Sequence, residues 1–117
     1  MELNDNFKLL SNTEKTIDFI NKQLVNFPKT EYLLKENIEK SMYGLIKAIF
    51  SYRIEDISRI KLKYLKDLLI DLSMLDYYVR LSYKKKIISQ KKLLQISNFL
   101  LEIKKISYGV IRNEKSI

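Results

Sequence analysis

Apolar residues recur every three or four positions along most of the chain, which is the spacing of one face of an α-helix. This period predicts four helices, at about residues 13–26, 31–53, 58–85 and 90–112. Residues 1–11 show no strong period, so we expect a flexible arm there and a short tail over residues 113–117. Four helices joined by short corners predict an all-α fold, an antiparallel four-helix bundle over residues 12–112.

The one proline marks the first corner. Pro28 lacks a backbone N–H and disfavours the helical conformation at Phe27, so a helix that begins near residue 13 must end there. Thr30 is then the expected N-cap of the next helix, with Glu31 in its favourable first turn. The expected N-caps of the two later helices are Ser58 and Ser89.

One apolar stripe on each helix is the expected core. Fully burying such a side chain contributes roughly 1.5–3 kcal/mol, and these stripes together oppose the entropy cost of ordering the chain. The stripes comprise Ile17, Ile20 and Leu24 on the first helix, then Leu34, Ile38, Met42, Leu45 and Ile49 on the second. On the third they comprise Leu62, Leu65, Leu69, Leu72 and Val79, and on the fourth Leu93, Ile96, Leu100, Ile103 and Val110.

The opposite faces of the three long helices also carry aligned apolar residues. Scattered exposed apolar residues are ordinary, but aligned ones on three helices of a small domain indicate contact with another chain. The alternative is a broad core stripe whose edges these residues form. We expect a homo-oligomer that buries them, with an interface formed by Leu33, Tyr43, Phe50, Ile70, Met74, Tyr77, Leu81, Leu94, Leu101 and Tyr108.

Composition narrows the function classes. At 117 residues with 46% hydrophobic residues, the chain suffices for one domain with one core. It holds no Cys and no His, which removes thiolate metal sites, disulfides and the commonest general base. We therefore expect no enzyme activity, no catalytic residues, no metal and no cofactor.

Two pairs of charged residues have a spacing that needs interpretation. Asp76 and Arg80 are four residues apart on the third helix, which favours a structural ion pair over a catalytic carboxylate. Asp67 and Asp71 are also four apart and could hold a cation in principle. The flanking lysines, Lys63 and Lys66, favour surface pairing instead.

Charge is unevenly divided along the chain. Residues 1–58 hold 8 Lys/Arg against 9 Asp/Glu, whereas residues 59–117 hold 14 against 5. This asymmetry indicates a polyanionic partner for the second half, although a solvated surface of a lysine-rich chain is the alternative. No sequence-reading module is present, so binding should be electrostatic and weakly sequence-specific. The expected binding cations are Arg59, Lys63, Lys66, Arg80, Lys84, Lys85, Lys86, Lys91, Lys92, Lys105 and Arg112.

Membrane and secretion signals are not found in the sequence. No apolar run approaches the roughly 20 residues of a membrane span, and the N-terminal residues lack the apolar core of a signal peptide. We expect a cytoplasmic protein with no membrane partner.

Five short motifs lie in a characteristic order over about residues 15–112. With the short first helix and three long ones, they resemble the accessory variability determinant (Avd) proteins of diversity-generating retroelements. The resemblance implies a basic, barrel-shaped homopentamer of four-helix bundles. The motifs are Phe27-Pro28-Lys29-Thr30, Tyr32-Leu33, Arg80-Leu81, Ile88-Ser89 and Glu102-Ile103.

The resemblance also implies a function. An Avd-like protein would bind the retroelement reverse transcriptase and template RNA or cDNA, and support mutagenic reverse transcription without being an enzyme. One alternative is the related four-helix protein encoded in 23S rRNA intervening sequences, which associates with RNA only. Another is a purely structural helical assembly protein.

Overall fold

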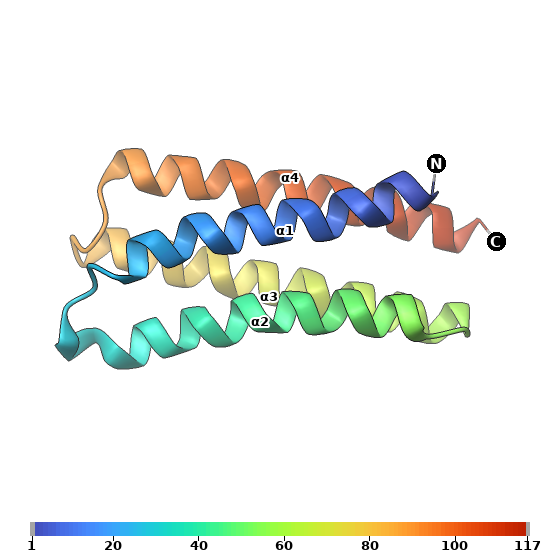
Figure 1. The fold of residues 1–117 in the computed structure, drawn as a ribbon, viewed down its shortest axis with the longest axis horizontal. Helices are drawn as coiled ribbons and strands as arrows, with labels where there is room; N and C mark the ends of the chain where they lie inside the picture. The colour runs from blue at the N-terminus through green and yellow to red at the C-terminus, as the bar shows by residue number, and fades with distance from the viewer. Residues whose placement is uncertain (1, 117) are drawn as a thin grey trace.

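The computed structural model describes residues 2–116, and the side chains from residue 6 onward. All regular structure in this range is helical, which confirms the predicted all-α fold with four helices (Figure 1). The bundle is elongated, with principal extents of 47 × 23 × 18 Å. Its elements are α1 (Glu2–Leu24), the 3-10 helix η1 (Lys29–Glu31), α2 (Tyr32–Ile54), α3 (Ser58–Lys84) and α4 (Gln90–Lys115).

Successive helices run in opposite directions (Figure 1). Residues 25–31 and 85–89 therefore lie at one end of the bundle, here called the corner end. The start of α1, the end of α4 and residues 55–57 lie at the other, the terminal end. Each helix packs against the next in a ring, α1 to α2 to α3 to α4 and back to α1, whereas the described parts of the diagonal pairs bring no Cα atoms within 8 Å of each other.

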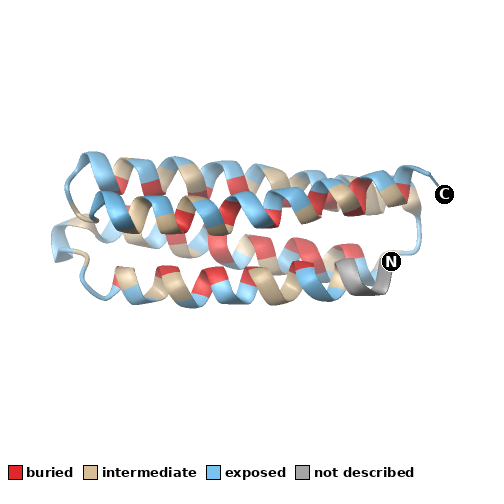
Figure 2. Cartoon of the chain, turned by 90° about the horizontal axis from the view of Figure 1, so that it is seen from above, coloured by how far each residue is buried: buried red, intermediate tan, exposed pale blue. Residues whose placement is uncertain are grey.

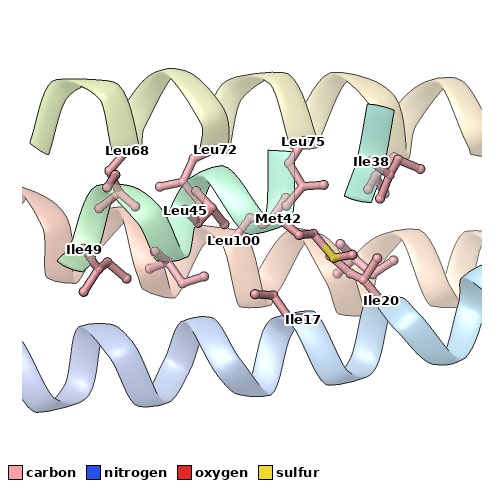
Figure 3. Packing of buried hydrophobic residues seen from close by; sticks show 14 of the residues in the cluster. Ile17, Ile20, Ile38, Met42, Leu45, Ile49, Leu68, Leu72, Leu75 and Leu100 are labelled. Carbon is pink, nitrogen blue, oxygen red and sulfur yellow. The ribbon is translucent and has the colours of Figure 1, made fainter. Parts of the chain in front are cut away.

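The predicted core stripes are confirmed. Buried positions face inward on all four helices and exposed positions face outward (Figure 2). Leu45, Leu72 and Leu100 meet at the centre, from three different helices (Figure 3). Only the edges of the stripes differ, because the expected core residues Leu62, Leu69 and Leu93 are half-buried, while the core gains Tyr52, Leu68 and Leu75.

The first helix is longer than predicted. The flexible arm expected over residues 1–11 instead belongs to the first helix in its described part, because α1 begins at Glu2 and Leu9 is fully buried. The apolar period is hidden by two buried threonines. Thr13 donates its hydroxyl hydrogen bond to the carbonyl of Leu9, and Thr16 to that of Asn12, each at 2.7 Å. These bonds satisfy both hydroxyls inside the core, so polar residues occupy inward positions.

The expected C-terminal tail also differs from the structure. The fourth helix does not end near residue 112 but continues to Lys115, so the tail expected over residues 113–117 is helical in most of its described part. Glu114 is buried there rather than free in solution. A buried carboxylate needs hydrogen-bond partners, and this one has Ser58.

The caps match the predictions only in part. Ser89 is the N-cap of α4, as expected, and its Oγ accepts a hydrogen bond from the backbone N–H of Lys92 at 3.2 Å. Thr30 does not cap α2, because it lies inside η1 and the helix begins at Tyr32. Ser58 is the first residue of α3 rather than its N-cap, a position taken by Ile57.

Candidate interaction surfaces

The eleven cations predicted to bind a partner do not form one patch. Six lie toward the corner end and five in the half nearer the terminal end, so the 47 Å length of the bundle divides them (Figure 1). The antiparallel topology causes this division, because α3 and α4 each carry cations at both ends. The corner-end set is Arg80, Lys84, Lys85, Lys86, Lys91 and Lys92, and the other set is Arg59, Lys63, Lys66, Lys105 and Arg112.

A hydrogen-bonded turn shapes the corner end. Lys86 has a left-handed backbone conformation, with φ of 63°. Its N–H donates to the carbonyl of Tyr83 and the N–H of Ile87 donates to that of Ser82, both at 2.9 Å. This pair of bonds is the Schellman motif, in which glycine is the usual left-handed residue. The turn borders a shallow hollow of about 480 Å³ with Lys84 at its rim.

Several corner-end cations already have partners within the chain. Lys85 Nζ lies 3.2 Å from Glu31 Oε1, which ties the α3–α4 corner to the start of α2. Arg80 Nε bonds Asp76 Oδ2 at 2.9 Å, as the sequence predicted. Lys92 Nζ lies 5.2 Å from the centre of the Phe19 ring. The exposed corner-end cations with no acidic partner among the described side chains are Lys84, Lys86 and Lys91.

Two further cations at this end come from the first half of the sequence. Lys22, in the last turn of α1, and Lys29, at the start of η1, are both exposed. Residues 25–31 and 85–89 share this end of the bundle (Figure 1). Lys22 and Lys29 were not among the predicted cations, because that prediction was based on the positive charge of the second half of the sequence. The antiparallel topology alone indicates that both lie at this end.

In the other half of the bundle, Lys63 pairs with Asp67, with Nζ and Oδ2 3.7 Å apart. Lys66 has no such pair, so the expected surface pairing holds for one lysine only. Lys66 and the remaining cations of this set are exposed and have no acidic oxygen of the described side chains within 4 Å. They are Arg59, Lys105 and Arg112.

A close approach between α2 and α3 escaped the sequence reasoning. Gly44 faces the Asp71 carboxylate, and a Cβ at residue 44 would overlap that group. Burial raises the pKa of the Asp71 carboxyl above its usual value of 3.8, and the nearby Asp67 charge raises it further. The missed signal was a glycine inside a helical pattern, which commonly marks a packing constraint.

The outward apolar residues are exposed as predicted, with one exception. Nine of the ten expected interface residues are exposed, on α2, α3 and α4. The exception is Leu81, which is half-buried and packs against the core, so its assignment to the outer surface is wrong. The outward side of α1 exposes Glu14, Asp18 and Lys22 along its second half, and Phe7 near its start.

A groove of about 430 Å³ runs between the outer edges of α3 and α4. Its apolar lining includes Leu69, Leu101 and Tyr108, and the Asp76–Arg80 ion pair also lines it. Asp76 thus lies half-buried at the wall of this groove. No three metal-ligating side chains converge anywhere in the described residues, and none of the described helices is long and apolar enough to cross a membrane.

The family follows from a direct comparison. The bAvd-like family model matches residues 8–114, which include parts of all four helices. This chain belongs to the bAvd-like family. A search of curated proteins and a search of solved structures each found no match.

The family match confirms the resemblance seen in the sequence motifs. It begins at residue 8, within the segment predicted to be an arm and shown to be helical. Avd-like proteins are accessory proteins and generally not enzymes. The bAvd-like chain exposes cations at both ends and apolar residues on the outward faces of three helices.

Proposed function

We propose that this bAvd-like chain is the accessory protein of a diversity-generating retroelement. In this proposal it is non-enzymatic and acts in the cytoplasm. It binds the reverse transcriptase and template RNA or cDNA through its basic surface, and supports mutagenic reverse transcription. The observation that carries the proposal is the family match, together with a group of exposed and unpaired cations at the corner end.

The corner end suits a phosphate backbone. Lys84, Lys86 and Lys91 are exposed there with no acidic partner among the described residues, and Lys22 and Lys29 add to the same end. Lysines that neutralise phosphates release counterions, which gives sequence-independent binding that weakens with salt. Tyr83, also exposed beside the hollow, can stack on an unpaired base.

The decisive experiment compares two triple charge reversals of equal net charge. The test variant is K84E/K86E/K91E, which spares Lys85 because that lysine holds Glu31. The control is K8E/K15E/K115E, at exposed lysines away from the corner end. Fluorescence anisotropy with a single-stranded RNA at two salt concentrations measures nucleic-acid binding, and co-purification with a co-expressed reverse transcriptase measures the protein partner.

The expected result is loss of RNA and polymerase binding in the test variant only. The slope of log K against log salt should become shallower by about 2 if three phosphate contacts are removed. Equal binding by both variants would remove the corner end from the proposal. A wild-type protein that assembles but binds neither partner would be a structural assembly protein instead.

Assembly is the second part of the proposed function. The nine exposed apolar residues on three helices are the supporting observation, since small monomeric proteins rarely align so many. We propose a barrel-shaped homopentamer. Light scattering should give a mass near five times 14.0 kDa at two protein concentrations. A monomeric mass at both concentrations would overturn this part.

A further inference from the structure

We propose that the outward face of α2 in one copy docks into the α3–α4 groove of the next copy. The docking face, here called the α2 stripe, consists of Tyr32, Tyr43, Phe50 and Ile54. Each chain then contacts two neighbours through two different surfaces. This inference rests on the self-assembly proposed above and specifies which surfaces meet.

The two surfaces share a spacing. Tyr43 and Phe50 are seven residues apart on α2, as are Leu101 and Tyr108 on α4. Residues seven apart stay on one side of a helix, which is the spacing by which packed helices meet a neighbour. All four side chains are exposed in the single chain, at 59% and 46% on α2 and 50% and 44% on α4.

The two surfaces also lie at the same level along the bundle. Both α2 and α4 run from the corner end to the terminal end (Figure 1). Gly44 of α2 faces Asp71 of α3, and Ser73, two residues away on α3, lines the same groove as Leu101 of α4. Tyr43 and Leu101 therefore lie at similar levels along the bundle. Seven residues further along each helix, Phe50 and Tyr108 also lie at similar levels.

Equal levels matter because of symmetry. Copies related by rotation about an axis parallel to the helices keep each residue at its own height. Tyr43 of one copy then meets Leu101 of the next, and Phe50 meets Tyr108. A contact between two different surfaces closes into a ring when the rotation closes, as an odd-numbered assembly requires.

The positions of α2 and α4 within one chain support this arrangement. They are diagonal in the bundle, and no Cα atoms of the two helices lie within 8 Å of each other. Because the α2 stripe faces outward, it cannot reach the groove of its own chain, and the two surfaces can face two neighbours at once. The exposed polar residues Glu14, Asp18 and Lys22 of α1 are left for solvent.

The proposed contact depends on apolar side chains rather than on charge. The outward side of α2 carries charges of both signs, because Glu36 pairs with Lys40 and the exposed Lys47 lies between Tyr43 and Phe50. The groove likewise combines Arg80 and Lys104 with the Asp76 carboxylate.

Cysteine cross-linking tests the pairing, because the wild-type chain has no cysteine. In F50C/Y108C, the two thiols lie on the outward sides of diagonal helices with no Cα atoms within 8 Å of each other, so a disulfide between positions 50 and 108 joins two copies. After mild oxidation, non-reducing electrophoresis should show a ladder for the double variant. F50C alone and Y108C alone should stay monomeric, whereas a mixture of the two should give dimers only.

The matched control is E14C/Y108C, which places one thiol on the polar face of α1 and should give no ladder. A short bismaleimide repeats each test, so that an imperfect disulfide geometry does not hide a true contact. Cross-linking of F50C alone would show a two-fold contact of α2 with itself and overturn the inference. An oligomer by light scattering with no 50–108 cross-link would overturn the pairing but leave the proposed assembly intact, and a monomer would overturn both.

Discussion

Ser58, the first residue of α3, donates its hydroxyl hydrogen bond to Oε2 of Glu114, near the end of α4, across 2.5 Å. The carboxylate is buried although it is an acidic group. It lies at the N-terminus of α3, where the helix dipole favours negative charge. This contact joins the last turn of α4 to the first turn of α3 and closes the terminal end of the bundle.

Removing the donor of this bond should destabilise the fold. In S58A the Glu114 carboxylate stays buried without its partner, which costs about 1–3 kcal/mol of unfolding free energy. Urea unfolding at fixed protein concentration measures the effect. The control E102A alters an exposed glutamate of the same helix and should change stability by no more than about 0.5 kcal/mol. Equal stability of S58A and wild type would mean that the contact contributes nothing.

The two glycines should respond differently to alanine. Alanine stabilises a helix interior by about 1 kcal/mol relative to glycine, and Gly109 has room for the added methyl group. At Gly44 the methyl group meets the Asp71 carboxylate, so G44A should lose part or all of that gain. Thermal unfolding measures both. In the D71A background the carboxylate is absent, and G44A should then raise the melting temperature as G109A does. If it does not, the Asp71 carboxylate is not what opposes a methyl group at residue 44.

Asp71 makes stability depend on pH in a definite direction. Burial and the Asp67 charge raise the pKa of Asp71 in the folded state, so the folded protein holds this proton more tightly than the unfolded chain does. The favourable contribution is complete below the usual pKa of 3.8 and is lost as pH rises through the raised value. At neutral pH, D71N should therefore be more stable than wild type.

The advantage of D71N should shrink as pH falls toward 3.8, because wild-type Asp71 then becomes neutral as well. Urea midpoints measured from pH 3 to pH 7 provide the check. D67N serves as the comparison, since Asp67 pairs with Lys63 on the surface. An advantage of D71N that stays constant over this range would show that ionisation of Asp71 is not its cause.

Substitutions at Lys86 can distinguish the effect of its left-handed backbone conformation on stability from the effect of its charge on RNA binding. Lys86 occupies the position of the Schellman motif that glycine fills at no steric cost, so K86G should stabilise the bundle by about 1 kcal/mol. K84G alters the last residue of α3 and should destabilise the bundle, by less than the roughly 1 kcal/mol that glycine costs in a helix interior. Both variants lose one cation. If lysine charge at the corner end binds RNA, anisotropy should show weaker RNA binding in both despite their opposite stabilities.

The long helices were predictable because their cores are purely aliphatic stripes. Ile38, Met42 and Leu45 repeat at the helical period, and this period can be recognised without knowing which helices pack against α2. The start of α1 was not predictable in this way. Thr13 and Thr16 look polar in a sequence pattern, and only their hydroxyl bonds to the preceding turn make them compatible with burial.

For the candidate surfaces, too, one property was predictable from the sequence and another was not. Exposure of Tyr43, Phe50 and Tyr108 was predicted correctly, because a residue opposite a core stripe must face outward. All three lysines of the run Lys84–Lys86 were predicted to bind a partner, but Lys85 pairs with Glu31, 54 residues earlier in the chain. A pattern read along one helix carries no information about a partner on another.

By itself, the sequence determined the helical class, the inward and outward faces of α2, α3 and α4, and the excess of positive charge in its second half. These properties depend on the order of residues along one helix, which its period reveals. The tertiary structure alone decided which cations remain unpaired, that Lys22 and Lys29 join the corner end, and that Gly44 lies against Asp71. These features depend on which helices become neighbours and at what level, and that is set by packing across the core.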